Sequence, residues 1–187
     1  AKFVRPTGLD QSEVGWENMV DWDRLQHVIR NAVHFLDNVI DANEYSIPEI
    51  EEMTRATRKI GLGVMGFADL LIKLRIPYNS EEARIVGDEV MRFVNHMASV
   101  KSLELGSLRG TFPAWEQSSY KIQENYRNAC RLTVAPTGTI SMLADTSSGV
   151  EPTFALAWKK MNILEGETLY YVNKYFQIAL LSVNNIN

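Results

Sequence analysis

The chain has 187 residues, of which 45% are hydrophobic and 22% are charged, and its formal net charge at neutral pH is −4. This size and composition are those of one globular domain with a hydrophobic core, and the acidic balance argues against nucleic acid or an anionic membrane as the main partner. No apolar run reaches the roughly 18 residues that a membrane-spanning helix needs. The single cysteine, Cys130, excludes an internal disulfide, so we expect a cytoplasmic protein.

Residues 1–20 are expected to be irregular, and the first regular elements follow them. Apolar residues at three- and four-residue spacing predict a helix over 22–40, with Asp21 as its N-cap. Pro48 suits the first turn of a second helix, predicted over 47–58.

A glycine-rich stretch at 61–66 matches Gly-x-Gly-x-x-Gly by letter. A dinucleotide-binding fingerprint needs a preceding strand, a following helix and an acid about twenty residues on, and here the residues upstream have a helical pattern. We therefore favour close packing of this backbone against a neighbouring element over a dinucleotide site. A third helix is predicted over 67–75, ended by Pro77.

The longest predicted helix covers 80–107, where Asn79 and Glu82 resemble a capping box, and a connection follows at 109–125. The chain has three histidines, none of which lies at a spacing that completes a metal site with a carboxylate or the cysteine. We therefore favour solvated or locally bonded roles for His27, His34 and His96.

The second half of the chain alternates short strands with polar loops. A strand over 130–135 leads into a turn at 135–141, and a polar loop follows at 144–152. A second strand is predicted over 153–161 and a last helix over 168–183. Helices dominate, and the few strands lie next to the polar loops, which favours part of an α/β barrel or layered sheet over a helical bundle.

The turn at 135–141, Ala-Pro-Thr-Gly-Thr-Ile-Ser, is the strongest indication of a binding site. A strand ends at a proline, a glycine lets the backbone turn, and three hydroxyl residues cluster where a helix begins. Backbone N–H groups and hydroxyls at such a turn can hold an anion, and the helix dipole adds positive potential. The turn has no lysine like that of a P-loop. The alternative is a tight strand-to-helix connection whose hydroxyls only cap the helix.

Other chemically reactive side chains give weaker signals. For Cys130 we favour a buried structural thiol over a redox or nucleophilic role. Ser141 lacks the Gly-x-Ser-x-Gly context of a hydrolase nucleophile. Glu151 could be a site carboxylate or could cap backbone groups in its loop. Tyr170 and Tyr171 are adjacent on a predicted helix and face different directions, which argues against a radical relay.

Three segments together resemble the later part of the catalytic barrel of ribonucleotide reductases. They are residues 35–41, residues 58–71, and residues 135–141 continuing through 147–152. The resemblance runs from about residue 1 to about residue 176. Thr-Gly-Thr-Ile-Ser, followed by Ser-Ser-Gly-Val-Glu-Pro, is more similar to the adenosylcobalamin-dependent class II enzymes than to the iron-dependent type.

The resemblance implies that residues 1–187 form a single partial domain, the helix-rich C-terminal portion of a ten-stranded α/β barrel and its substrate-phosphate-binding half. It implies an oxidoreductase of deoxyribonucleotide biosynthesis and DNA replication, which converts ribonucleotides to deoxyribonucleotides by radical chemistry, with adenosylcobalamin as the cofactor of the complete enzyme. The substrate diphosphate would lie on a loop of six residues: Pro136, Thr137, Gly138, Thr139, Ile140 and Ser141.

The family's radical and redox cysteines have no counterpart in this chain. The family forms a thiyl radical on a finger-loop cysteine and draws electrons from a further cysteine pair, and Cys130 resembles none of these. We therefore expect the chain to carry no catalytic residue or metal ligand of its own and to be inactive alone. It would be a fragment, a separately encoded piece of a split enzyme or a shortened chain.

An incomplete barrel exposes strand edges and apolar helix faces. We therefore expect the chain to self-associate or to assemble with the upstream segment that carries the finger-loop cysteine. The alternative hypothesis is a non-catalytic helical domain that binds a phosphorylated ligand or a protein.

Overall fold

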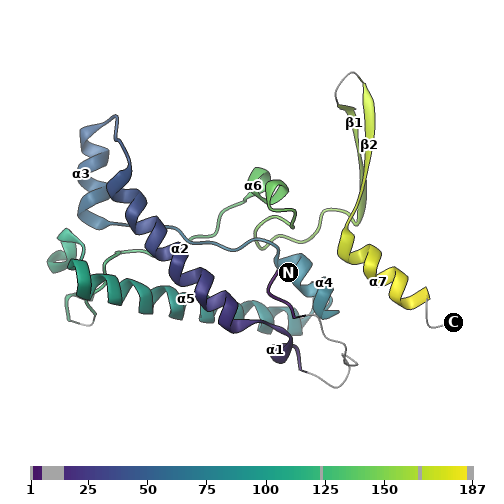
Figure 1. Ribbon diagram of the computed structural model, residues 1–187, viewed down its shortest axis with the longest axis horizontal. Coiled ribbons are helices and arrows are strands. Elements are labelled where there is room, and N and C mark those ends of the chain that lie inside the picture. The colour runs from purple at the N-terminus through teal and green to yellow at the C-terminus, as the bar shows by residue number, and fades with distance from the viewer. Residues whose placement is uncertain (1, 6–14, 123, 164–165, 185–187) are drawn as a thin grey trace.

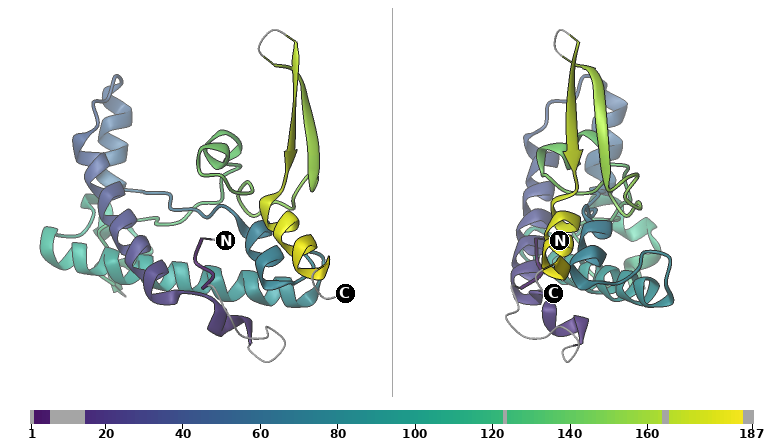
Figure 2. Two further views of the ribbon diagram at one scale, coloured as in Figure 1. Left: turned by 45° about the vertical axis from the view of Figure 1, so that its right-hand side comes forward. Right: turned by 90° about the vertical axis from the view of Figure 1, so that its right-hand side faces the viewer.

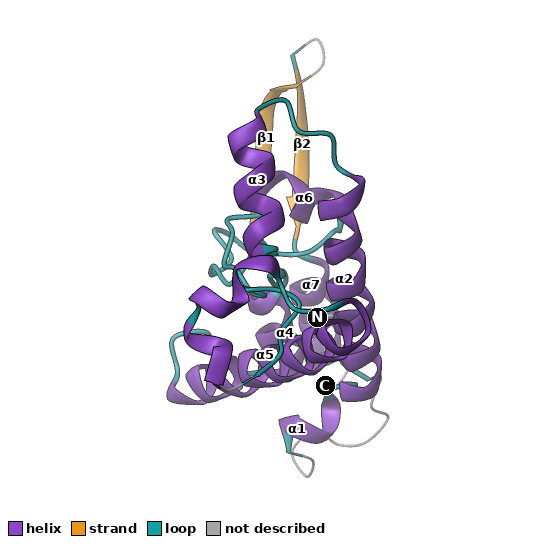
Figure 3. Ribbon diagram, turned by 90° about the vertical axis from the view of Figure 1, so that its left-hand side faces the viewer, coloured by secondary structure: helices purple, strands orange, loops and turns teal. Residues whose placement is uncertain are grey.

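A computed structural model of the chain describes residues 2–5, 15–122, 124–163 and 166–184. Helices dominate this part of the chain, with one pair of strands near its end (Figures 1 and 3). The order is α1 (Trp16–Met19), α2 (Trp22–Ala42), α3 (Pro48–Thr57), α4 (Phe67–Leu74), α5 (Glu81–Arg109), the 3-10 turns η1 (Pro113–Gln117) and η2 (Ser119–Ile122), α6 (Gly138–Leu143), β1 (Ala157–Ile163), β2 (Glu167–Val172) and α7 (Lys174–Asn184).

The hydrophobic core is formed by α2, α4 and α5, and α2 crosses α5 obliquely (Figure 1). Buried apolar residues recur every three or four positions, which places them on one face of each helix. They include Ile29, Val33 and Ile40 in α2, and Val86, Val90, Val94, Ala98 and Leu105 in α5. The spacing that predicted these helices is therefore the spacing that builds the core. No helix among the described residues is both long and apolar enough to span a membrane.

The predicted N-cap is correct for α2 and wrong for α5. Asp21 caps α2 as predicted, since its carboxylate accepts a hydrogen bond from the Arg24 amide at 3.2 Å. The capping box at Asn79 is wrong by one residue, because Ser80 takes the extended backbone that an N-cap needs and accepts from the Ala83 amide at 3.1 Å. In the stretch predicted to be irregular, α1 is helical; residues 1 and 6–14 lie outside the described residues.

The predicted strand at 130–135 is not a regular strand. It runs parallel to the glycine-rich stretch through a single bridge between Leu62 and Leu132. The Ile60 amide donates to the Cys130 carbonyl and the Thr133 amide donates to the Leu62 carbonyl, at 2.9 and 3.0 Å. Among the described residues the only sheet is the two-stranded one formed by β1 and β2, so the ten-stranded barrel remains an expectation for a complete enzyme.

The predicted helix at 168–183 is wrong over its first third, because β2 occupies that part and α7 begins only at Lys174. The predicted strand at 153–161 begins later, at Ala157. β1 and β2 pair antiparallel, and the rings of Trp158 and Tyr171 stack at 5.6 Å. This cross-strand pairing favours the strand. The hairpin projects away from the helical body (Figure 2).

Candidate functional site

The turn predicted to bind an anion begins the short helix α6. Thr137 takes a left-handed backbone conformation, with φ of 58°, and Gly138 is the first helical residue. The first amides of a helix have no acceptor within it, and among the described residues the amides of Gly138, Thr139 and Ile140 donate to no other backbone carbonyl. A side chain added at Gly138 would meet no heavy atom within 4 Å. The turn therefore offers backbone donors beside open space.

Two of the hydroxyls in this turn point inward and hold its shape. The Thr137 hydroxyl accepts a hydrogen bond from the Gly149 amide at 2.7 Å. Ser141 is buried, where its hydroxyl donates to the Gly138 carbonyl at 3.0 Å and lies 2.9 Å from the Ser148 hydroxyl. These two side chains tie the turn to the loop that follows α6. By contrast Pro136, Thr139 and Ile140 are exposed.

The loop after α6 is held in turn by Asp69, a buried acid in the first turn of α4. One Asp69 oxygen accepts from the Ser147 amide at 2.7 Å and from the Thr146 hydroxyl at 3.1 Å, and the other accepts from the Asn173 amide group at 2.9 Å. The Gly66 amide also donates to the Ser147 carbonyl, at 2.8 Å. Asp69 was not among the sequence candidates, since a lone acid in a first turn predicts only a favourable helix-dipole interaction.

The glycine-rich stretch packs directly on the segment that leads into the turn. A side chain added at Gly61 would come within 2.8 Å of the Thr133 side chain, and one at Gly63 within 2.8 Å of the Thr133 carbonyl. The prediction of close backbone packing at 61–66 is confirmed, because only residues without a side chain allow the two segments to approach this closely.

Two of the three histidines are bonded to neighbouring side chains, as predicted. His27 lies 2.9 Å from the Asn31 amide and His34 lies 3.0 Å from the Arg109 guanidinium, so both are locally bonded. Within the described ranges no group of three histidine, cysteine or acidic side chains could hold a metal ion.

For Cys130 the sequence predicted a buried thiol, and for Glu151 it left the role open. Cys130 is exposed, so the prediction of a buried thiol is wrong; its segment is paired through a single bridge and is not enclosed within a sheet. Glu151 is exposed, and its backbone amide donates to the Ser148 carbonyl at 3.1 Å.

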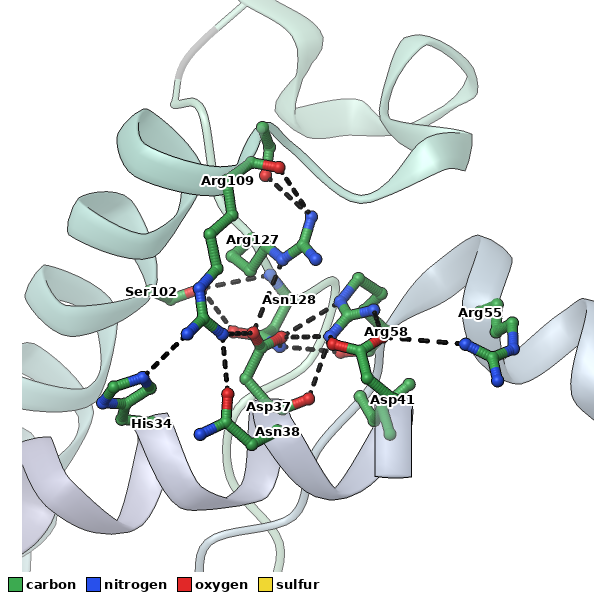
Figure 4. A network of polar contacts seen from close by, with 12 residues as sticks. His34, Asp37, Asn38, Asp41, Arg55, Arg58, Ser102, Arg109, Arg127 and Asn128 are labelled. Atoms are coloured by element: carbon green, nitrogen blue, oxygen red, sulfur yellow. Dashed lines mark hydrogen bonds and ion pairs between the residues drawn. The ribbon is translucent and has the colours of Figure 1, made fainter. Parts of the chain in front are cut away.

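A second polar cluster, which sequence reasoning missed, surrounds the fully buried Asp37 of α2 (Figure 4). Arg58 donates to one carboxylate oxygen through two nitrogens at 3.0 and 2.8 Å, and Asn128 donates to the same oxygen at 3.0 Å. Arg109 and Arg127 approach the other oxygen at 3.2 and 3.5 Å. The cluster joins α2, the end of α3, α5 and the segment before the turn.

Asp37 is fully buried, and the residues around it also pair with one another. Asn128 also exchanges hydrogen bonds with the buried Ser102, and Arg58 pairs with Asp41 at 2.7 Å. The hydrogen bond from Arg58 holds the pKa of the Asp41 carboxyl below its ordinary value, against the opposing effect of burial. Burial lowers the pKa of Arg58, but the hydrogen bonds to Asp41 and Asp37 outweigh it and raise the pKa above its ordinary value.

Comparison with known proteins matches nearly the whole chain to one protein family. The family model described as "Ribonucleotide reductase, barrel domain" matches residues 1–126 and 121–186. The vitamin B12-dependent ribonucleoside-diphosphate reductase of Thermoplasma acidophilum is 50% identical over 159 residues, which cover 84% of this chain and 21% of that protein. The enzyme of the same name from Mycobacterium tuberculosis is 48% identical over 160 residues, covering 86% and 23%.

A more distant relative is the ribonucleoside-diphosphate reductase subunit alpha of Chlamydia trachomatis, 30% identical over 203 aligned residues that cover 86% of this chain and 19% of that protein. The chain spans about a fifth of the length of these relatives, with matched shares of 21%, 23% and 19%.

Proposed function

This chain belongs to the ribonucleotide reductase family, whose barrel-domain model matches it, and we propose that it supplies the loop that binds the diphosphate of a ribonucleotide substrate. The observation that carries the proposal is the start of α6. There the amides of Gly138, Thr139 and Ile140 have no backbone acceptor among the described residues, and the space beside Gly138 is open.

The chemistry of this turn suits a diphosphate. Backbone N–H groups at a helix start donate to phosphate oxygens, and the partial positive charge of the helix end favours an anion. The absence of a side chain at Gly138 lets an oxyanion approach the backbone closely. Ser141 does not act as a nucleophile in this proposal, because its buried hydroxyl donates to the Gly138 carbonyl and contacts Ser148.

The complete enzyme is proposed to convert ribonucleotides to deoxyribonucleotides with adenosylcobalamin, the cofactor type that the names of the two most similar relatives above indicate. We place no binding site for this cofactor on the described residues. An apolar pocket of about 300 Å³ lies between α2, α5 and the glycine-rich stretch, which is at the small end of the volumes that hold drug-sized ligands. We therefore assign no step of the reaction to the cofactor on these residues.

The radical and the electrons would reach the substrate from the cofactor and from cysteines on an upstream segment. The proposal therefore includes assembly, and exposed apolar side chains support it: Phe154 is fully exposed, and Leu108 and Leu143 are 79% and 85% exposed. We expect the chain alone to self-associate in sedimentation experiments and to form no deoxyribonucleotide. Turnover should appear only on mixing with the upstream segment, adenosylcobalamin, a reductant and a ribonucleotide.

The loop itself is tested by replacing Gly138 with valine in the full chain and measuring the binding of a nucleoside diphosphate by calorimetry. The valine side chain would fill the open space, so the affinity should fall by about tenfold or more, which corresponds to at least 1.4 kcal/mol. Ser107→Val, at an exposed position of α5, is the matched control and should leave binding unchanged. Equal affinity of Gly138→Val and the wild type would remove the loop from the site.

A further inference from the structure

Asp69 makes no direct hydrogen bond to the proposed diphosphate loop at 137–141. It is connected to that turn through the loop at 146–149, which bonds both to Asp69 and to the turn. The side chain is 2% exposed, which is rare for an acid and requires that its oxygens be well paired. We propose that Asp69 is a positioning residue that sets the shape of the turn at 137–141 through the loop at 146–149. The inference rests on the proposed function of that turn.

The first step of the connection runs from Asp69 to the loop at 146–149. The carboxylate accepts from the Ser147 amide at 2.7 Å and from the Thr146 hydroxyl at 3.1 Å. In return the Ser147 hydroxyl accepts from the Asp69 backbone amide at 3.2 Å. Hydrogen bonds to an ionised carboxylate are stronger than neutral ones, so this reciprocal pair fixes the loop against the first turn of α4.

The second step runs from that loop to the turn. The Gly149 amide donates to the Thr137 hydroxyl at 2.7 Å, and the Ser148 hydroxyl lies 2.9 Å from that of Ser141. Thr137 precedes α6 and Ser141 lies within it, so the loop forms hydrogen bonds to the turn on both sides of Gly138. The residues bonded to Asp69 and the residues bonded to the turn are immediate neighbours in the chain, which makes the connection short and stiff.

The backbone of the turn needs such support. Thr137 has φ of 58°, and Asp145, just after α6, has φ of 51°. A residue with a side chain is strained in this left-handed conformation, and it keeps the conformation only where the surroundings hold it. The Gly149 amide holds Thr137, and the Lys174 ammonium bonds the Asp145 carbonyl at 3.1 Å. Without the 146–149 loop, Thr137 would relax and the amides beyond it would lose their common direction.

Asp69 also ties the turn to the end of the chain. Its second oxygen accepts from the Asn173 side-chain Nδ2 at 2.9 Å, and the Asn173 side-chain oxygen Oδ1 caps α7 by accepting from the Tyr175 backbone amide at 2.9 Å. Helices α4 and α7 pack together (Figure 2). One carboxylate therefore joins α4, the loop behind the turn and the start of α7.

The test compares Asp69→Asn with Asp37→Asn in the full chain, with inorganic pyrophosphate as the probe. Asp37 is the matched control, because it is an equally buried acid whose hydrogen bonds do not reach the turn. In Asp69→Asn we expect the Ser147 and Gly149 amides to exchange with solvent about tenfold faster or more by NMR, and pyrophosphate affinity to fall about tenfold or more. In Asp37→Asn the fold should be less stable, but under conditions where it stays folded these two amides and the affinity should match the wild type.

Thr146→Val is a milder second variant, which removes one hydrogen bond to Asp69 and keeps the side-chain shape. It should change exchange and affinity in the same direction by a smaller factor, and it remains informative if Asp69→Asn does not fold. Normal binding and normal amide exchange in both variants would overturn the role of Asp69 and leave the proposed function intact. Failure of the wild type to bind pyrophosphate would instead overturn the proposed function. The amide exchange rates would then still decide whether Asp69 orders the turn.

Discussion

The Asp37 cluster and the proposed diphosphate loop are both polar, and both hold a non-glycine residue in the left-handed conformation, Arg58 with φ of 45° and Thr137 with φ of 58°. They differ in what their hydrogen-bonding groups meet. In the cluster each carboxylate oxygen of Asp37 faces cationic groups of the protein itself (Figure 4). In the loop the amides from Gly138 to Ile140 meet no backbone acceptor among the described residues. Polar groups paired internally serve the fold, whereas donors left beside open space are available to a ligand.

The largest expected effect on stability comes from removing the central carboxylate of the Asp37 cluster. Replacing Asp37 with alanine would leave Arg58, whose side chain is 5% exposed, without a main acceptor. Removing one partner of a buried ion pair costs about 3–5 kcal/mol, so the free energy of unfolding measured with urea should fall by that amount. The control is Asp23→Ala, since the Asp23 side chain is 96% exposed and should change stability by less than about 0.5 kcal/mol. A loss below about 1 kcal/mol for Asp37→Ala would contradict the inference that the ion pairs of Asp37 stabilise the fold.

A smaller effect is expected where a glycine of the packed glycine-rich stretch is compared with Gly138 of the proposed diphosphate loop. Gly66 has φ of 80°, and a side chain there would collide with the Thr146 hydroxyl, whereas at Gly138 the space is open. Gly66→Ala should therefore lower the free energy of unfolding by about 1–3 kcal/mol. Gly138→Ala should leave it unchanged or raise it by up to about 1 kcal/mol, because alanine favours a helix. Equal losses in the two variants, measured by urea unfolding, would mean that the turn at Gly138 is as tightly packed as the one at Gly66.

The Asp37 cluster should also make the free energy of unfolding depend on pH in the acid range, through Asp41. Because Arg58 keeps the pKa of Asp41 lower in the folded state than in the unfolded state, ionised Asp41 stabilises the fold above the unfolded value of about 3.9. This stabilisation is lost as the pH falls through the folded pKa. The wild type should therefore exceed Asp41→Asn in unfolding free energy at pH 7, and the difference should shrink below about pH 4. A difference that does not change over this range would show that the Asp41 charge contributes nothing.

The smallest expected effect is at a pair on the rim of the α2–α5 contact, outside both regions. Arg30 donates to both oxygens of Glu104 at 2.6 and 2.8 Å, but the two side chains are 30% and 39% exposed. Exposed ion pairs contribute about 0.2–1 kcal/mol, and salt screens them. Glu104→Gln should therefore cost less than about 1 kcal/mol, with a smaller cost in 1 M salt. A cost as large as that of Asp37→Ala would show that exposure does not separate the two kinds of pair.

The sequence predicted well the features that depend on residues close together in the chain. Helices α2 and α5 follow from apolar spacing, the start of α3 from Pro48 and the end of α4 from the nearby Pro77. The turn at Gly138 was identified from proline, glycine and hydroxyl residues that are adjacent in the sequence. The close packing of the glycine-rich stretch was also anticipated, although the partner, Thr133, was not.

The features that were missed depend on residues far apart in the chain. Asp69 meets Ser147 at a separation of 78 residues, and Asp37 meets Asn128 at a separation of 91. The sequence near either acid carries no sign of its partner. The strand β2 was mistaken for helix for a related reason, since pairing with β1 and the stacking of Tyr171 on Trp158 outweighed a helical reading of the local pattern.

By itself the sequence determined where α2 to α5 lie and where the turn before α6 begins, because these depend on local spacing and on backbone preferences of single residues. Only the tertiary structure decided which acids are buried and what they hold. Asp37 and Asp69 are both acids on helices, and burial pairs one with arginines and the other with the backbone behind the turn. A buried charge must find partners wherever the fold brings them, and that choice is made in space rather than along the chain.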